Sequence, residues 1–258
     1  MSAIHPTALV DPRARLAPGV GVGPYTVIDG DVEIGAGTSI GAHCVVTGHT
    51  TIGRENRVFH FCSIGEANQD KKYGGEPTRL SIGDRNTIRE YCSLHRGTVQ
   101  GGGITSVGHD NWIMAYCHIA HDCHVGDHAV FANNATLAGH VTVGDHAVLG
   151  GFTGVHQFVK IGAHVMAGVS SVVLQDIPPY VTVAGHPCAP HGINGEGLRR
   201  RGFTPDSIAA LKRAYKTLYK SGLGLAEAKA ELERQARDAP VVGAIVAFLA
   251  TATRGIVR

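Results

Sequence analysis

The chain has 258 residues, enough for one or two domains with a sizeable core, and it is rich in glycine (35 residues) but has only 17% charged and 6% aromatic residues. Its formal net charge of +2 argues against binding nucleic acid through bulk electrostatics. Six cysteines without a CxxC pair indicate free thiols in a reducing compartment, not a disulfide framework. Because residues 1–6 lack the pattern of a secretory signal and no apolar run reaches about 18 residues, we expect a cytoplasmic protein without a membrane span.

Aliphatic residues recur every six positions from the start of the chain. Eleven keep one register: Ile4, Val10, Leu16, Val22, Ile28, Ile34, Ile40, Val46, Ile52, Val58 and Ile64. A second series, ten of its twelve members Ile, Leu or Val, is Val107, Ile113, Ile119, Val125, Phe131, Leu137, Val143, Leu149, Val155, Ile161, Ala167 and Val173. A period of six fits neither a helix nor an ordinary two-faced strand, and it indicates a solenoid of short strands.

Two stretches interrupt this period. The first lies near residues 66–80, after which the register resumes in phase at Ile82, and the second is a glycine-rich stretch near 97–105, after which it returns one residue out of phase at Val107. Insertions into a solenoid emerge as surface loops, where binding residues tend to lie.

The six-residue register resembles that of the hexapeptide-repeat proteins, over roughly residues 4–180. The resemblance implies a mostly β fold, a left-handed parallel β-helix with three hexads in each 18-residue coil. A β-sandwich of short strands would not keep eleven hexads in phase. We therefore predict a β-helix domain over residues 1–190, with inserted loops near 66–80 and 97–105.

The hexads stop after Pro178 and Pro179. Thr204 followed by Pro205 is typical of a helix N-terminus, apolar residues then recur at helical spacing, and Gly222 ends the pattern. Residues 225–237 and 241–253 predict two further helices. We expect residues 191–258 to form a small C-terminal α-helical domain.

In a β-helix with 18-residue coils, residues 18 apart in the sequence lie on top of each other in neighbouring coils. His121 would stack on Gly139, and Gly139 on Gln157, while Asp122 would stack on His140. His121, oriented by Asp122 and next to a bare glycine amide, is the arrangement of a general base beside an oxyanion donor. Most of the sixteen histidines are expected to be ordinary surface or packing residues.

Metal binding is the alternative reading of this segment. Its candidate ligands are Cys117, His118, His121, Cys123 and His124. Alternation along a strand favours inward-pointing cysteines that act as small hydrophobes, and nothing marks either thiol as an activated nucleophile. We therefore predict no metal, although a zinc hydratase like the gamma-class carbonic anhydrases stays open.

Longer motifs resemble the UDP-N-acetylglucosamine O-acyltransferase family, from about residue 3 to the end. They span residues 65–70, 74–79, 95–103, 118–123, 133–140, 155–158, 196–203 and 253–255. The resemblance implies transfer of a 3-hydroxyacyl group from acyl carrier protein to the 3-hydroxyl of UDP-N-acetylglucosamine, the first step of lipid A biosynthesis. It also implies a homotrimer and no cofactor.

The resemblance assigns roles to individual residues. His121 would be the base, Asp122 would hold its ring, and the Gly139 amide would meet the oxyanion. Substrate contacts would come from Gln69, Asp70, Lys72, His118, His140, His156, Gln157, Asn194, Glu196, Arg200 and Arg201. The last two suit a diphosphate, because a guanidinium can bind phosphate oxygens bidentately.

The resemblance places the acyl chain near Val165 and Val169, where a β-branched Val169 would narrow the slot and favour a shorter chain. The acyl length and the choice between a 3-hydroxy and a 3-amino sugar stay open. So do two other functions: the related glucosamine N-acyltransferase and a non-catalytic hexapeptide scaffold.

Overall fold

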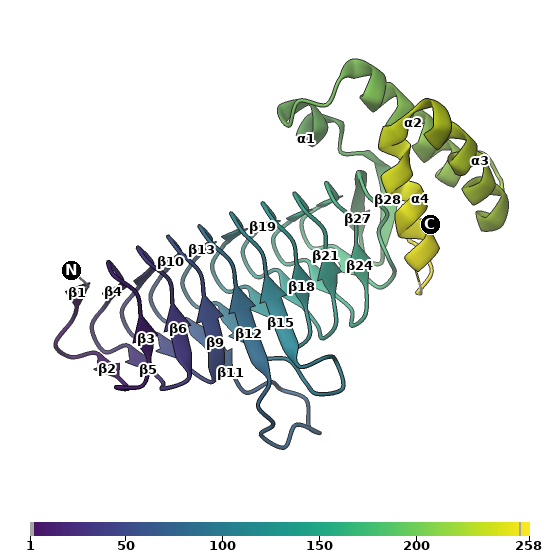
Figure 1. The fold of residues 1–258 in the computed structure, drawn as a ribbon. Coiled ribbons are helices and arrows are strands. Elements are labelled where there is room, and N and C mark those ends of the chain that lie inside the picture. Colours follow the sequence, from purple (N-terminus) through teal and green to yellow (C-terminus); the bar gives the residue numbers. More distant parts are fainter. Residues whose placement is uncertain (1–2, 253) are drawn as a thin grey trace.

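The computed structural model describes residues 3–252 and 254–258, and it is a left-handed parallel β-helix with helices at its C-terminal end (Figure 1). The predicted fold class is confirmed. Residues 1 and 2 of the predicted first domain, and Thr253 at the predicted end of the last helix, lie outside the described residues. No helix among those described is long and apolar enough to span a bilayer.

Three sheets form the faces of a triangular prism, and each coil contributes one short strand to each sheet. Sheet A contains β1 (Ala3–Ile4), β4 (Gly21–Val22), β7 (Ser39–Ile40), β10 (Arg57–Val58), β13 (Thr87–Ile88), β16 (Trp112–Ile113), β19 (Val130–Phe131), β22 (Val148–Leu149), β25 (Met166–Ala167), β27 (Val181–Gly185) and β28 (Cys188–Ile193). Sheet B contains β2 (Leu9–Val10), β5 (Val27–Ile28), β8 (Val45–Val46), β11 (Ser63–Glu66), β14 (Ser93–His95), β17 (His118–Ile119), β20 (Thr136–Leu137), β23 (Gly154–Val155) and β26 (Val172–Val173). Sheet C contains β3 (Arg15–Leu16), β6 (Val32–Ile34), β9 (His49–Ile52), β12 (Arg79–Ile82), β15 (Ile104–Val107), β18 (His124–Val125), β21 (Thr142–Val143) and β24 (Lys160–Ile161).

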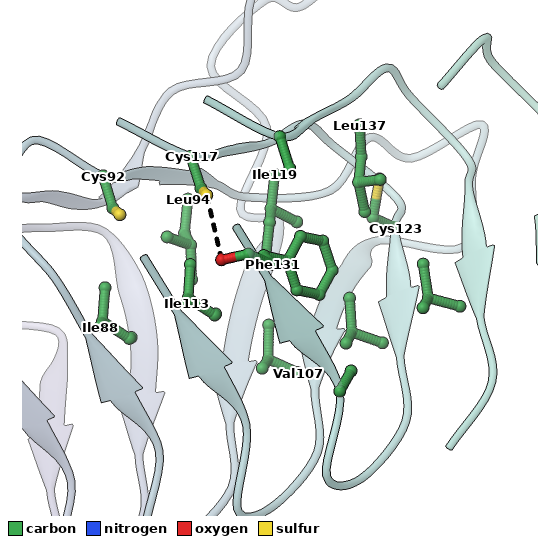
Figure 2. Packing of buried hydrophobic residues seen from close by; sticks show 14 of the residues in the cluster. Ile88, Cys92, Leu94, Val107, Ile113, Cys117, Ile119, Cys123, Phe131 and Leu137 are labelled. Atoms are coloured by element: carbon green, nitrogen blue, oxygen red, sulfur yellow. Dashed lines mark hydrogen bonds between the residues drawn. The ribbon is translucent and has the colours of Figure 1, made fainter. Parts of the chain in front are cut away.

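The hexad residues fill the prism, as their period predicts. Four of them are fully buried, and Figure 2 shows these side chains pointing into the interior from strands of sheets A and B: Ile88, Leu94, Ile113 and Ile119. Burying an aliphatic side chain of this size contributes about 1.5–3 kcal/mol relative to leaving it exposed. The repeated hexad therefore supplies one continuous core along the β-helix.

Each corner of the prism requires a left-handed backbone turn. Asp122 (φ 59°), Asn134 (φ 63°) and His140 (φ 63°) adopt it without being glycine. Rings in this conformation stack from coil to coil: the centroids of His128 and His146 lie 4.7 Å apart, close to the ordinary strand spacing. This stacking offsets part of the backbone cost of the turn.

The three corners are named after the sheets they join. The BC corner includes residues 120–123, 138–141 and 156–159, the CA corner 126–129 and 144–147, and the AB corner 114–117 and 132–135. Both inserted loops, 67–78 and 96–103, leave the prism between sheets B and C, on the same side (Figure 1). Two loops distant in sequence are thereby brought to one corner.

The C-terminal helices are α1 (Gly195–Arg200), α2 (Pro205–Tyr219), α3 (Leu225–Asp238), the 3-10 helix η1 (Pro240–Val242) and α4 (Gly243–Thr251). Thr204 caps α2 by accepting a hydrogen bond from the Ser207 N–H, so the predicted helix start is confirmed. The short helix α1 was not predicted. Sheet A also continues past Pro179 through β27 and the antiparallel β28, and the division at residue 190 stays a prediction.

Candidate active site

A cleft of about 890 Å³ opens at the BC corner. Both inserted loops and successive coils of the prism contribute to its walls. The lining residues are Gln69, Asp70, Lys71, Lys72, His95, Thr98, Gln100, His118, Ala120, His121, Thr136, Leu137, Ala138, Gly139, His140, Gln157 and Phe158. Its position agrees with the expectation that the insertions of the solenoid frame the binding residues.

His121 and Asp122 form a hydrogen-bonded pair at the base of the cleft. The His121 Nδ1 atom lies 2.8 Å from Asp122 Oδ2, and the two side chains are 16% and 1% exposed. A carboxylate can only accept hydrogen bonds, so Nδ1 carries the proton and Nε2 keeps a free lone pair. The imidazole is therefore oriented and poised to accept a proton.

Gly139 lies directly against the His121 ring. A Cβ atom added at Gly139 would lie 2.5 Å from His121 Cε1 and 2.7 Å from Nε2, so only glycine allows this approach. The Gly139 carbonyl accepts a hydrogen bond from Phe158, but among the described residues the Gly139 N–H has no hydrogen-bond partner. A donor amide is thus available beside the proton acceptor, as the stacking of coils predicts.

His140 lies on the other side of the pair. Its Nε2 is 3.7 Å from Asp122 Oδ2, and its ring stacks on Phe158 with centroids 4.3 Å apart. Burial lowers the pKa of His140, and the nearby Asp122 charge only partly opposes this shift. The predicted contact between position 122 and position 140 is confirmed.

Two further histidines extend the wall of the cleft. His118 Nδ1 lies 2.7 Å from the Ser93 hydroxyl, and burial, helped by His95 and His121, lowers its pKa to about 4. His95 is buried edge-on against the His118 ring, and burial lowers its pKa as well. Both imidazoles are therefore neutral near pH 7, so the cleft holds uncharged hydrogen-bonding groups.

The first inserted loop closes the opposite wall. Gln69, Asp70 and Lys72 all line the cleft, as predicted. The Asp70 carboxylate accepts the backbone N–H of Lys72 at 3.0 Å, and Asn68 Nδ2 donates to the carbonyl of Gly97 at 2.9 Å. The second bond ties the first loop to the second one.

The cysteines and histidines of the metal interpretation do not converge. Cys117 and Cys123 are buried in the prism, where their thiols donate to the carbonyls of Ala132 and Ala138, and His124 bonds with Ser106 on sheet C. Burial raises the pKa of Cys123 to about 12. A hydrogen bond with Cys92 lowers the pKa of Cys117, but both cysteines are buried core residues, as predicted, and neither thiol is accessible to a substrate in the cleft.

Another set of metal-ligand types does come together: one ligand atom from each of His121, Asp122 and His140 lies within 4.8 Å of the others. However, Asp122 Oδ2 already accepts His121 Nδ1 and the Thr98 hydroxyl, and Oδ1 accepts the Thr98 N–H. A metal held by all three residues would have to displace these bonds. The donor set therefore fits a hydrogen-bonded dyad better than a metal site.

Comparisons with known proteins show the family of this chain. The model of the UDP N-acetylglucosamine O-acyltransferase domain 2 family matches residues 176–257, and that of the bacterial transferase hexapeptide family matches residues 13–48 and 104–139. A protein of Thiobacillus denitrificans named acyl-(acyl-carrier-protein)–UDP-N-acetylglucosamine O-acyltransferase is 64% identical over 258 residues, covering all of both chains. The chain belongs to the UDP-N-acetylglucosamine O-acyltransferase family. It is therefore an acyltransferase.

Solved structures of the family agree closely with the fold. The structure of LpxA from Acinetobacter baumannii has a TM-score of 0.97 at 48% identity and covers 99% of both chains. The UDP-N-acetylglucosamine acyltransferase of Francisella novicida also gives 0.97, at 40% identity, covering 99% of this chain and 94% of that one.

Four predicted substrate residues of this acyltransferase lie away from the cleft. Asn194 caps α1 and donates to the His164 carbonyl, which places α1 at the CA corner. Glu196 pairs with Arg199 and Arg200, while Arg201 donates to the Gly197 carbonyl. Asn194, Glu196, Arg200 and Arg201 thus gather around one helix but not around the cleft of their own chain.

Three other predictions come out differently. Gln157 lines the cleft, but its neighbour His156 is exposed beside it and is not among the lining residues. Val165 is fully buried in the prism, so its side chain faces the core, and the acyl pocket near this position stays a prediction. Val169 is 71% exposed and lies against Gly151 at the AB corner, away from the cleft of its own chain.

The sequence analysis missed His95 and Thr98 as lining residues. Stacking by 18 residues fails across an insertion, where Ser93 pairs with His118 over 25 residues. Counting each insertion before stacking the coils would have placed residues 93–95 beneath 118–120. Phe158 was reached correctly, because 18-residue spacing predicts that it stacks on His140.

Proposed function

We propose that this acyltransferase moves a 3-hydroxyacyl group from acyl carrier protein to the 3-hydroxyl of UDP-N-acetylglucosamine, as the first step of lipid A biosynthesis. Full-length identity of 64% to a relative named for these two substrates supports the reaction. The observation that carries the mechanism is the oriented His121 imidazole, 2.8 Å from Asp122 and packed on the Gly139 backbone.

In this mechanism His121 Nε2 removes the proton of the sugar 3-hydroxyl as its oxygen attacks the thioester carbonyl carbon. The carbonyl oxygen becomes an oxyanion, which the free N–H of Gly139 stabilises. The intermediate then collapses, the carbon–sulfur bond breaks, and the imidazolium returns its proton to the departing thiolate. A positioned base contributes about 10²–10⁴ in rate and one oxyanion donor about 10²–10³.

The neutral side chains around the dyad support the same mechanism. His118 and His95 have lowered pKa values, so near pH 7 they place no positive charge beside the imidazolium that forms on His121 during the reaction. Gln69, Asp70 and Lys72 supply donors and an acceptor for the sugar at the mouth of the cleft. We propose that these groups, with His140 and Gln157, orient the acceptor sugar.

We also propose a homotrimer. Asn194, Glu196, Arg200 and Arg201 lie at the CA corner, whereas the cleft lies at the BC corner, so only a second copy of the chain could offer them to a nucleotide bound in the cleft. Two guanidinium groups suit the diphosphate. Sedimentation equilibrium of the purified protein measures the number of chains directly.

Acyl carrier protein is acidic, and α2 exposes Lys212, Arg213, Lys216 and Lys220. We propose that this face steers the carrier during docking. The reaction needs no metal or organic cofactor in this mechanism, and the six free cysteines are compatible with the cytoplasm.

An acyl-transfer assay with defined carrier-protein thioesters and UDP-sugars tests the proposal. The wild-type protein should acylate UDP-N-acetylglucosamine, and His121→Ala should lower kcat by about 10²–10⁴ while leaving the fold intact. Turnover of the variant within a few-fold of wild type would remove the proposed base. Addition of a chelator distinguishes the zinc alternative, because only a metal enzyme would lose activity.

A further inference from the structure

The glycine-rich loop at residues 97–103 wraps around the carboxylate of Asp122. Thr98 donates its backbone N–H to Oδ1 at 2.8 Å and its hydroxyl to Oδ2 at 2.6 Å. Oδ2 also accepts His121 Nδ1 at 2.8 Å. One threonine therefore supplies two of the three hydrogen bonds that the described side chains and amides give to this carboxylate.

The Thr98 hydroxyl is fixed as a donor to Asp122 by its other hydrogen bond. Its oxygen accepts the N–H of Gly101 at 3.1 Å, and a hydroxyl has a single proton to donate. That proton is directed to Asp122. The side chain is 3% exposed, so water does not compete for the bond.

The glycines of the loop make this approach possible. A Cβ on Gly101 would overlap the Asp122 carboxylate, and one on Gly97 would lie 2.8 Å from Oδ1. Neither glycine has the left-handed backbone that would otherwise explain it. The need for space around the carboxylate accounts for the glycine at position 101, whereas a Cβ at Gly97 would lie still closer to the Ile104 backbone nitrogen, at 2.4 Å.

From this geometry we infer that Thr98 is a positioning residue of the acyl-transfer reaction, acting through Asp122 on the orientation of the His121 imidazole. A buried carboxylate needs donors to stay in one rotamer and to stay charged. Without the Thr98 hydroxyl, Oδ2 keeps only His121 as a donor, and the Thr98 backbone N–H on Oδ1 is the one remaining bond from the loop, so the carboxylate is held less firmly. The inference rests on the proposed function of His121 as the base.

Thr98→Val removes the hydroxyl at nearly constant shape. We expect kcat to fall about 10–100-fold, the range that corresponds to losing a hydrogen bond to a charged group, while KM for both substrates stays within about twofold. Thr98→Ser keeps the hydroxyl and should restore kcat to within about threefold of wild type. The inference would be overturned if Thr98→Val raised KM and left kcat unchanged, or if Thr98→Ser did not restore kcat.

Thr78→Val is the matched control. Thr78 is a second buried threonine in the inserted segments, 2% exposed, and its Oγ1 has no hydrogen-bond partner among the described residues. The same substitution there removes no bond, so kcat should stay within about twofold. A fall as large as that of Thr98→Val would assign the effect to packing and overturn the inference.

Gly101→Ala keeps every hydrogen-bonding group and displaces only the Asp122 carboxylate. It tests the same inference if Thr98→Val does not fold. It should also lower kcat at least about tenfold without raising KM.

Crystal structures provide a readout without activity. The bond between His121 Nδ1 and Asp122 Oδ2 should persist in Thr98→Ser and lengthen beyond hydrogen-bond distance in Thr98→Val. If it stays near 2.8 Å in Thr98→Val, the inference fails even when wild type is active. If wild type transfers no acyl group, the proposed function fails, and the crystal structures still decide the placement of Asp122 by Thr98.

Discussion

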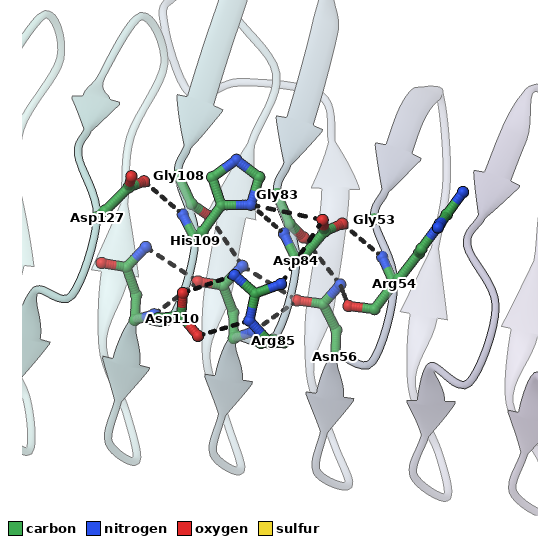
Figure 3. A network of polar contacts seen from close by, with 12 residues as sticks. Gly53, Arg54, Asn56, Gly83, Asp84, Arg85, Gly108, His109, Asp110 and Asp127 are labelled. Atoms are coloured by element: carbon green, nitrogen blue, oxygen red, sulfur yellow. Dashed lines mark hydrogen bonds and ion pairs between the residues drawn. The ribbon is translucent and has the colours of Figure 1, made fainter.

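The BC and CA corners join the same coils but use their polar residues in opposite ways. At the CA corner, hydrogen bonds run along the prism: Asn56 Oδ1 accepts the N–H and the side-chain amide of Asn86, and Asn86 Oδ1 accepts those of Asn111 (Figure 3). At the BC corner the carboxylate of Asp122 bonds sideways, into an inserted loop, through Thr98. The regular corner stabilises the stack of coils, and the interrupted corner holds a reactive pair in place.

Carboxylates show the same contrast. Asp84 and Asp127 accept backbone N–H groups of the preceding coil, from Arg54 and His109, each at 2.7 Å (Figure 3). These carboxylates cap a turn in a position that water reaches. Asp122 is 2% exposed and bonds to an imidazole that lines the cleft. A polar residue at a corner is therefore structural or functional according to where its hydrogen bonds go.

The largest expected effect comes from removing charge at the BC corner. Asp122→Asn leaves the size of the side chain unchanged but no longer stabilises the imidazolium that forms on His121. We expect kcat to fall about 10²–10⁴-fold, and the free energy of unfolding to fall by about 1–3 kcal/mol because the new amide group faces a hydrogen-bond donor. Steady-state acyl transfer and thermal unfolding of the same preparation measure the two effects, and a kcat within threefold of wild type would contradict the contrast between the corners.

The reverse outcome is expected at the CA corner. Asn86→Ala leaves the N–H and the side-chain amide of Asn111 and the carbonyl of Gly108 without their partner. Each buried unsatisfied group costs about 1–3 kcal/mol, so we expect the free energy of unfolding to fall by at least about 3 kcal/mol while kcat changes less than twofold.

Denaturant unfolding checks the stability of Asn86→Ala. Arg85→Gln is the control at the same corner. Arg85 forms a solvent-exposed ion pair with Asp110, so its substitution should lower the free energy of unfolding much less than Asn86→Ala does. Equal losses for the two variants would show that the asparagine ladder has no special role.

A smaller effect should be common to both corners. Burial, helped by neighbouring histidines and, for His164, by Arg201, lowers the pKa of His118 and of His164 from near 6.5 to about 4. The unfolded chain then binds protons that the folded chain does not, so stability falls as the pH drops from about 6.5 to about 4. His118→Gln and His164→Gln should each flatten this part of the curve of unfolding free energy against pH. A curve as steep as that of wild type in both variants would show that His118 and His164 do not cause the loss of stability at low pH.

The regular part of the structure could be predicted from the sequence because one rule governs it. Each hexad places one aliphatic inside, and 18-residue stacking brought Gly139 to His121 and His140 to Asp122. That rule needs no knowledge of distant contacts. It therefore predicted the fold and the centre of the site together.

The irregular parts could not be predicted in the same way. The contact between Thr98 and Asp122 depends on how a loop without a period folds back over 24 residues. The position of Val165 inside the prism follows from its place in the turn, before the hexad residue Ala167, which the acyl-pocket prediction overlooked. Asn194 and its neighbours were not assigned to a corner, because they follow the last hexad.

The insertions leave the strands paired, with one register shift in sheet B between Ile64 and Glu66. Ser63 pairs with Ser93 and Ser93 with His118, so strands separated by 30 and 25 residues meet in the same register as those separated by 18. Loop length is thereby uncoupled from the geometry of the scaffold. The first inserted segment can therefore change while the prism stays intact, whereas the second must keep the bonds of Thr98 to Asp122.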